Sequence, residues 1–244
     1  MTRHRLDELL VQRGLYASRS RARDAISRGT VTVDGVVAGK PAQNTSPESR
    51  IEILDEARAY VSRSALKLKS GINFFNISIK GLNCLDIGAS TGGFTQVLLE
   101  QGAAHVTAID VGHGQFDKSL QSHPNVTSIE GLNSRDLTAD HLKHKIEFIV
   151  CDASFISLKL ALPAALALVE SGTRLIALIK PQFEAGREAV GRGGIVSDPL
   201  EQERVCKEIS EFLTAENWRV LGITPSSIEG GDGNREFLIA AMKG

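Results

Sequence analysis

The spacing of hydrophobic residues changes along the first 57 residues, which separates them from the rest of the chain. Apolar residues first recur at helical intervals and then in every second position. The dipeptide Asp34-Gly35 lies between two of the alternating segments, where it predicts a tight hairpin turn. The predicted elements are helices over 6–15 and 18–28, a hairpin over 30–37 and a strand over 49–54. We therefore predict a small α+β domain over residues 1–57.

The longer second part alternates short apolar runs with helical patterns. The predicted strands are 83–87, 106–110, 126–130, 148–152, 175–180 and 237–242, and the predicted helices include 95–101, 158–169 and 200–216. Nearly continuous apolar strands alternating with helices are typical of a mainly parallel sheet that is covered on both faces. We predict a Rossmann-like, doubly wound α/β domain over residues 63–244. A short linker, 58–62, lacks a clear period and joins the two domains.

Composition adds few restrictions on function. The 244 residues are 42% hydrophobic with a formal charge of −1, as expected for a soluble protein with a substantial core. The chain has no apolar run of membrane-spanning length and no signal-peptide pattern, so we expect a cytoplasmic location and no membrane association. Three widely spaced cysteines indicate neither a disulfide framework nor a metal site. Arginines are concentrated near the N-terminus, which is therefore a candidate for nucleic-acid binding.

A glycine-rich turn follows the first strand of the larger domain and leads into a helix. Glycines there allow a ligand to approach the backbone, and Asp110, about twenty residues on, ends the next strand where ribose hydroxyls are bound in Rossmann-like folds. Ser90 stands where the dinucleotide pattern requires glycine, so the ligand is better matched by S-adenosyl-L-methionine. In the alternative, the glycines only allow close packing. The candidate cofactor residues are Asp86, Gly88, Ala89, Ser90, Gly92, Gly93, Phe94, Asp110, Asn133 and Asp152.

Four charged residues lie at or near the ends of predicted strands. Asp152 and Lys180 end two buried strands, Glu236 precedes the last strand, and Lys67 lies on the helix before the glycine-rich strand. A doubly wound sheet would bring these side chains together at its carboxyl edge. A single charged residue at a strand end is more often solvated than catalytic, so the hypothesis depends on the combination of all four.

The N-terminal segment resembles the RNA-binding domain named after ribosomal small-subunit protein S-four. The matching motifs are Arg5-Leu-Asp-Glu-Leu-Leu, Ser18-Arg-Ser-Arg-Ala-Arg, Ile26-Ser-Arg-Gly and Val31-Thr-Val-Asp-Gly. The resemblance implies an RNA-binding surface on the second helix and the hairpin, where arginines would contact phosphates. The alternative is a solvated arginine face. The candidate RNA-binding residues in this segment are Arg5, Arg19, Arg21, Arg23 and Arg28.

The whole chain is similar to the TlyA group, also labelled hemolysin A, which joins such a domain to an FtsJ-like class I methyltransferase domain. The matching motifs are Ser62-Arg-Ser-Ala-Leu-Lys, Leu85-Asp-Ile-Gly-Ala-Ser-Thr-Gly-Gly-Phe-Thr, Asp152-Ala-Ser-Phe-Ile-Ser-Leu, Lys180-Pro-Gln-Phe-Glu-Ala-Gly-Arg and Gly233-Asn-Arg-Glu-Phe-Leu. The resemblance implies methyl transfer from S-adenosyl-L-methionine to a ribose 2'-hydroxyl of ribosomal RNA, in this family a cytidine. It also implies a catalytic tetrad of Lys67, Asp152, Lys180 and Glu236.

These residue types suit methylation of a hydroxyl. Lys180 could stabilise the developing alkoxide or take its proton, Asp152 could orient Lys180, and no metal is required. Arg187 lies in a glycine-rich loop, 184–194, that could close on RNA. The expected partner is ribosomal RNA or a ribosomal subunit, with no obligate protein partner. Three other functions match the sequence less well. The tetrad and the glycine-rich turn argue against an RNA-binding protein without catalysis, and a membrane-active hemolysin would need an amphipathic or spanning segment that is not seen. A nucleotide-dependent oxidoreductase would have to explain Ser90 and the N-terminal RNA-binding unit.

Overall fold

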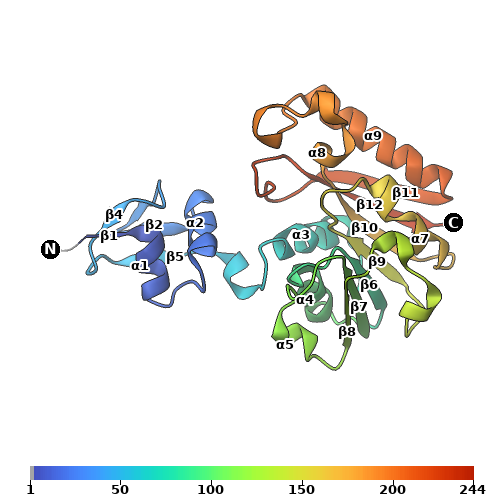
Figure 1. The fold of residues 1–244 in the computed structure, drawn as a ribbon, viewed down its shortest axis with the longest axis horizontal. Coiled ribbons are helices and arrows are strands. Elements are labelled where there is room, and N and C mark those ends of the chain that lie inside the picture. The colour runs from blue at the N-terminus through green and yellow to red at the C-terminus, as the bar shows by residue number, and fades with distance from the viewer. Residues whose placement is uncertain (1–2) are drawn as a thin grey trace. The chain divides into compact units, whose positions relative to one another are not determined.

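The computed structural model describes residues 3–244, and contacts divide the chain into two compact units, Met1–Ala59 and Tyr60–Gly244. Figure 1 shows the helices and strands of each unit. The first two residues of the predicted domain 1–57 lie outside the described residues. No helix within the described part combines the length and the hydrophobicity needed to cross a membrane.

The small unit packs two helices against short strands. Its helices are α1 (Leu6–Gln12), α2 (Arg19–Ser27) and a final 3-10 turn, η1 (Glu56–Ala59). Strands β2 (Val31–Val33), β3 (Val36–Val37) and β5 (Ile51–Ile53) form a sheet in the order β3-β2-β5, and β1 (His4–Arg5) pairs with β4 (Asn44–Thr45). The Oγ atom of Ser18 accepts a hydrogen bond from the backbone N–H of Arg21 and thereby caps α2. Ala22, Ala25 and Ile26 bury one face of α2 in the core of this unit, as the helical spacing predicts.

The large unit contains a seven-stranded sheet in the order β11-β12-β10-β9-β6-β7-β8. The strands are β6 (Asn83–Ile87), β7 (His105–Asp110), β8 (Val126–Glu130), β9 (Phe148–Cys151), β10 (Arg174–Ile179), β11 (Trp218–Pro225) and β12 (Phe237–Lys243). The strands from β6 to β10 are parallel, whereas β12 runs antiparallel to β10 and to β11. The predicted fold class, a mainly parallel doubly wound sheet beside a small α+β domain, is confirmed.

Helices cover both faces of this sheet (Figure 1). They are α3 (Ala65–Phe75), α4 (Gly93–Glu100), α5 (Lys118–Gln121), α6 (Leu158–Ala161), α7 (Pro163–Ala167), α8 (Pro181–Glu184) and α9 (Pro199–Ala215). Short 3-10 turns are η2 (Ser134–Asp136), η3 (Ala139–His141), η4 (Arg187–Ala189) and η5 (Arg192–Gly194). Along β9, Ile149 and Cys151 face one core and Phe148 and Val150 the other. Burial on both faces explains the continuous apolar strand sequences.

Two of the differences from the sequence predictions have a clear physical cause. The predicted helix 158–169 is broken at Pro163 into α6 and α7, because proline cannot donate the hydrogen bond that would continue α6. Strand β11 was not expected, because Gly222 and Pro225 interrupt its apolar pattern. Its register with β12 shifts between Val220 and Gly222, as in a β-bulge on the outer strand of a sheet.

Candidate active site

A cavity of about 660 Å³ lies at the carboxyl ends of β6, β7 and β9. Its lining includes the glycine-rich turn after β6, the loop after β7 and the segment that follows β9. The volume falls within the range of about 300–1,000 Å³ that is typical of small-molecule sites. In a doubly wound sheet this edge is where ligands bind. The five candidate cofactor residues that line the cavity are Gly88, Ser90, Asp110, Asn133 and Asp152.

The other candidate cofactor residues lie behind the cavity surface and shape the turn. A Cβ atom on Gly92 would lie 2.5 Å from Leu120 Cδ1, and one on Gly93 would lie 2.5 Å from Ser64 Oγ. Asp86, Ala89 and Phe94 are buried. Gly88 combines both roles, because it lines the cavity and a Cβ atom there would lie 2.9 Å from the backbone of Ala153. Close packing therefore explains part of the glycine pattern.

The carboxylate of Asp110 joins the glycine-rich turn to the end of β7. Its Oδ2 atom accepts a hydrogen bond of 2.8 Å from the N–H of Ser90, and its Oδ1 atom accepts one of 2.7 Å from the N–H of Gly112. Ser90 has a positive φ of 47°, a conformation that is uncommon outside glycine. On the next loop, Asn133 Oδ1 accepts hydrogen bonds from the N–H and Nε of Arg135, which fixes the start of η2.

Asp86 is a fully buried carboxylate on β6 under the glycine-rich turn. Its Oδ2 atom accepts a 2.7 Å hydrogen bond from Thr95, whereas Oδ1 has no hydrogen-bond partner among residues 3–244. Burial raises the pKa of Asp86 to about 7, and the negative charges of Asp152 and Asp110 contribute to this increase. An unpaired carboxylate oxygen below two further carboxylates makes this edge of the sheet favourable for a cation.

We expect Asp86→Asn to stabilise the large unit at alkaline pH. The native pKa lies above the usual carboxyl value, so the native state loses stability as pH rises from about 4 to about 7. The amide cannot ionise, so the gain in unfolding free energy should reach about 2–4 kcal/mol at pH 8.5 and become small at pH 5. Urea unfolding followed by fluorescence of Trp218, the single tryptophan, measures both values. A gain independent of pH would contradict the assignment.

The four charged residues expected at the strand ends form two ion pairs. Lys67 Nζ contacts Glu236 Oε2, and Lys180 Nζ lies 2.8 Å from Asp152 Oδ1. Glu236 immediately precedes Phe237 on β12, and Lys180 immediately follows Ile179 on β10. Phe237 and Ile179 lie opposite each other in the sheet. Both ion pairs therefore lie at the same end of the sheet. The exposed fractions of Lys67, Lys180 and Glu236 are only 6%, 7% and 3%. Of the four, Asp152 lines the cavity.

Ser154 contacts this cluster but was not among the predicted site residues. Its Oγ atom lies 2.7 Å from Lys180 Nζ, and it also lines the cavity. The next residue, Phe155, has a positive φ of 64° and an exposed fraction of 91%, and its ring lies 5.2 Å from that of Phe183. A lone serine in a loop carries no sequence signal that marks it as a site residue.

Comparison with known proteins agrees with this geometry. The FtsJ-like methyltransferase model matches residues 60–243, and the S4 domain model matches residues 4–51. The 16S/23S rRNA (cytidine-2'-O)-methyltransferase TlyA of Mycobacterium tuberculosis (strain CDC 1551 / Oshkosh) is 42% identical over 97% of this chain and 89% of its own. This chain belongs to the TlyA family of FtsJ-like methyltransferases.

Two other relatives extend the similarity. The 23S rRNA (cytidine-2'-O)-methyltransferase TlyA of Campylobacter jejuni subsp. jejuni serotype O:23/36 (strain 81-176) is 33% identical over 97% of this chain and 98% of its own. A solved structure from Streptococcus thermophilus, which carries the hemolysin label, is 38% identical with a TM-score of 0.78 and covers 100% of this chain and 89% of its own. The hemolysin name thus occurs within the TlyA family beside the methyltransferase name.

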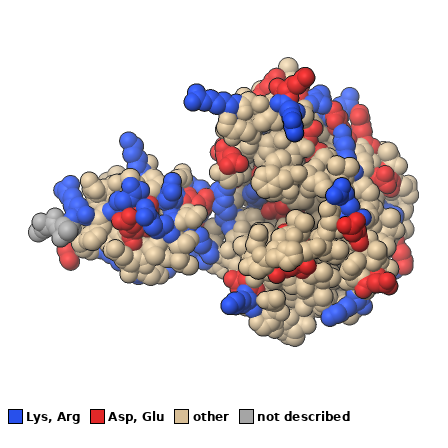
Figure 2. All heavy atoms as spheres, viewed as in Figure 1, with Lys and Arg blue, Asp and Glu red and all other residues tan. Residues whose placement is uncertain are grey.

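Many arginines of the S4 domain form ion pairs within that domain, and Figure 2 shows basic and acidic side chains next to one another on it. The buried carboxylate of Asp7 accepts hydrogen bonds from Arg5 and Arg19. Burial opposes ionisation of Asp7, but these hydrogen bonds and positive charges hold its pKa below the usual value. The side chain of Arg23 is exposed and forms no hydrogen bond or ion pair within the described part of the chain. The same holds for the side chain of Arg187 in the large unit.

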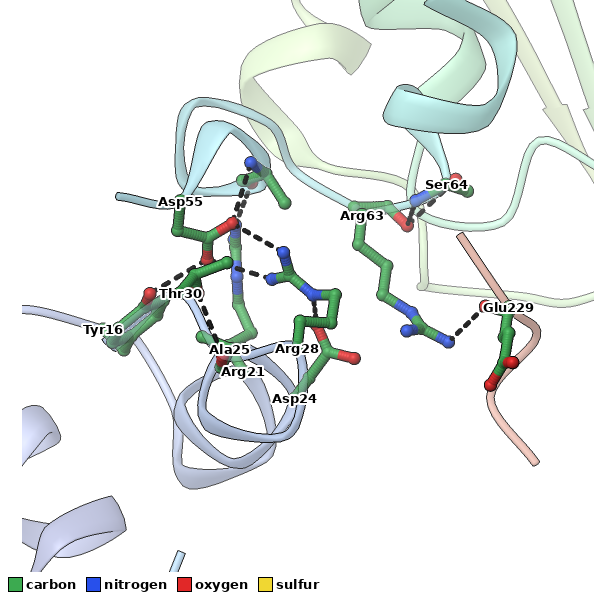
Figure 3. A network of polar contacts seen from close by, with 12 residues as sticks. Tyr16, Arg21, Asp24, Ala25, Arg28, Thr30, Asp55, Arg63, Ser64 and Glu229 are labelled. Atoms are coloured by element: carbon green, nitrogen blue, oxygen red, sulfur yellow. Dashed lines mark hydrogen bonds and ion pairs between the residues drawn. The ribbon is translucent and has the colours of Figure 1, made fainter. Parts of the chain in front are cut away.

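Arg28 stabilises the end of the S4 domain (Figure 3). Its two terminal nitrogens donate to the two oxygens of Asp55 at 2.9 and 3.0 Å, and its Nε donates to Asp24. Asp55 also accepts hydrogen bonds from Tyr16 and from the N–H of Ala57, and its side chain is 1% exposed. Burial opposes its ionisation, but these hydrogen bonds hold the pKa of Asp55 below the usual range. The Arg28 guanidinium therefore compensates a buried negative charge.

We expect Arg28→Ala and Arg23→Ala to have different effects. Arg28→Ala removes the positive charge that compensates the buried Asp55 carboxylate and should destabilise the S4 domain by about 3 kcal/mol, measured by hydrogen exchange of residues 50–59. Arg23→Ala should leave exchange unchanged while lowering the slope of log affinity against log salt for an rRNA fragment by about 1. A lower salt slope in Arg28→Ala with unchanged exchange would instead make Arg28 a phosphate contact.

Proposed function

We propose that this TlyA-family chain transfers a methyl group from S-adenosyl-L-methionine to the 2'-hydroxyl of a cytidine in ribosomal RNA. The observation that carries the proposal is the pair of lysine–carboxylate contacts, Lys67–Glu236 and Lys180–Asp152, at the cavity end of the sheet. These are the four residue types that the family resemblance implies for the catalytic tetrad. The names of the Mycobacterium and Campylobacter relatives support both the reaction and the nucleoside.

The cavity residues suit a cofactor that carries positive charge and a nucleoside. The buried carboxylate of Asp86 lies under the turn, and Asp110 and Asp152 line the cavity. Asp110 would accept the ribose hydroxyls of the cofactor, and Asn133 would contact its adenine. When bound, the cofactor supplies an electrophilic methyl group on a sulfonium centre. The sulfonium becomes a neutral thioether when it loses the methyl group, so this chemistry requires no metal from the protein.

Lys180 is the residue best placed to act on the substrate hydroxyl. Its ammonium group carries a positive charge beside the cavity, where it would stabilise the negative charge that develops on the ribose oxygen. Asp152 lies 2.8 Å from Lys180 Nζ and fixes its position. The Lys67–Glu236 pair would hold the RNA ribose or the Lys180 side chain in register from the neighbouring elements. Fixed donors of this kind act mainly by orienting the oxygen and stabilising charge.

We expect the N-terminal unit to contact RNA through its S4 domain. Arg5, Arg19, Arg21, Arg23 and Arg28 remain the candidates there, with Arg23 the least engaged in internal contacts. In the large unit, Arg187 is exposed on the loop after α8. Phosphate contacts by such side chains give affinity with little sequence preference, so the choice of nucleotide would depend on RNA shape and on the catalytic site.

A direct assay tests the proposal. The protein is incubated with radiolabelled S-adenosyl-L-methionine and with 30S or 50S subunits that lack the modification, and the RNA is then digested to nucleosides. Label in 2'-O-methylcytidine supports the proposed reaction and identifies the substrate subunit. Cofactor binding measured by calorimetry without label in either subunit would move the search to other RNAs or partly assembled particles. Absence of cofactor binding would favour a non-catalytic RNA-binding protein. Lysis of erythrocytes by the purified chain, measured in parallel, would instead support the hemolysin name.

A further inference from the structure

The ammonium group of Lys180 donates two hydrogen bonds and forms one ion-pair contact within the protein. It has three N–H bonds, and three oxygens lie within hydrogen-bonding distance of Nζ. These are Ser154 Oγ at 2.7 Å, Asp152 Oδ1 at 2.8 Å and the backbone oxygen of Asp152 at 3.3 Å. A substrate oxygen that reaches Lys180 from the side of Ser154 must therefore displace the Ser154 hydroxyl or share its hydrogen.

The position of Lys180 decides which contact is exchanged. Lys180 is 7% exposed and does not line the cavity, whereas Asp152 and Ser154 do. The Asp152 carboxylate holds the ammonium by opposite charge, and its backbone is fixed by the hydrogen bond from Asp152 N to Ile87 O. The Ser154 hydroxyl is neutral and turns about a single bond. It is therefore the acceptor that can leave Lys180 at the lowest cost.

We propose that, in the free protein, the Ser154 hydroxyl occupies the position on Lys180 that the ribose 2'-oxygen of the substrate takes. This inference rests on the proposed function. Both groups are hydroxyl oxygens, so the exchange preserves the number and the geometry of hydrogen bonds to the ammonium. Ser154 is then a positioning residue, which directs Lys180 Nζ towards the cavity before RNA binds and turns away when the ribose arrives.

Two variants of Ser154 distinguish the proposed positioning role from direct contact with the reacting ribose and from the absence of any role. Ser154→Ala removes the internal competitor, and a water molecule on Lys180 is displaced more easily than a tethered hydroxyl, so KM for RNA should fall about threefold. Ser154→Thr keeps the hydroxyl but adds a methyl group and restricts rotation about χ1. With the space beside Lys180 occupied, KM for RNA should rise about tenfold or more. Urea unfolding followed through Trp218 fluorescence checks that both variants retain the fold of the large unit.

The alternative roles of Ser154 predict different rankings of activity for the two variants and the unsubstituted protein. If the Ser154 hydroxyl itself contacts the reacting ribose, Ser154→Ala should lose about a hundredfold in kcat while Ser154→Thr retains most of its activity. If Ser154 has no role at Lys180, both variants should resemble the unsubstituted protein. Either result overturns the proposal, and so does a large loss of kcat in both variants.

A second measurement does not depend on methyl transfer. Lysines are acetylated briefly with an N-hydroxysuccinimide ester, and the extent at Lys180 is measured by mass spectrometry relative to Lys159, which is exposed. Removal of the covering hydroxyl should raise modification of Lys180 about threefold in Ser154→Ala but not in Ser154→Thr. Unchanged modification in Ser154→Ala shows that Ser154 does not cover Lys180 and refutes the proposal. If labelling changes as expected but the unsubstituted protein methylates no ribosomal RNA, the proposed function fails and the ribose cannot be the occupant.

Discussion

Lys180→Met is expected to abolish methyl transfer while leaving binding of S-adenosyl-L-methionine within a few-fold of its original affinity. The substitution keeps the aliphatic part of the buried side chain and removes the charge that would stabilise the ribose alkoxide. Loss of such a group lowers kcat by about a thousandfold. Cofactor binding should persist because Lys180 does not line the cavity, whereas Asp152 and Asp110 do. Single-turnover methylation of the subunit and calorimetry measure the two effects separately.

Lys159→Met is the matched control for this experiment. Lys159 forms an exposed ion pair with Glu208 on the surface, and its side chain is 41% exposed. Its loss should change neither kcat nor cofactor affinity by more than about twofold, because exposed ion pairs contribute little. If Lys180→Met loses cofactor affinity and kcat by equal factors, Lys180 contacts the cofactor and its assignment to the ribose is wrong.

The fold could be predicted because burial on both faces of a parallel sheet imposes a continuous apolar sequence on each strand. The strands from β6 to β10 follow this rule, and their carboxyl ends brought Asp152 and Lys180 to one edge as expected. Strand β11 could not be predicted in this way, because it lies at an edge and tolerates Gly222 and Pro225. Patterns of hydrophobicity thus identify central strands better than outer ones.

The side-chain contacts of the site could not be predicted from the sequence. Lys180 contacts both Asp152 and Ser154, and Lys67 contacts Glu236. These contacts depend on side-chain positions that are set by elements far apart in the chain. The S4 domain gives a similar example. Arginine spacing on α2 indicates a basic face, but the buried carboxylate of Asp55 engages Arg28 in an internal contact. Charge patterns therefore identify candidates, and burial of the opposing acids separates structural arginines from exposed ones.

In the buried Lys67–Glu236 pair each charge compensates the other, and we expect the pair also to position the ribose or Lys180 for methyl transfer. A double substitution separates these two contributions. Lys67→Met leaves the Glu236 carboxylate unpaired at 3% exposure, and Glu236→Gln leaves the Lys67 ammonium unpaired. Each single change should lower the unfolding free energy by about 3 kcal/mol, because an uncompensated charge remains buried. Urea unfolding followed through Trp218 fluorescence reports on the large unit, which contains that residue.

Combining Lys67→Met with Glu236→Gln removes both charges and should restore most of the lost stability, since a buried ion pair is often replaced by neutral groups at little net cost. Methyl transfer should not recover with it. A purely structural pair would regain activity together with stability, whereas a pair that positions the ribose or Lys180 would leave the stable double variant inactive. Single-turnover rates measured well below the unfolding midpoint of every variant distinguish the two cases, because loss of folded protein then contributes nothing to the loss of rate.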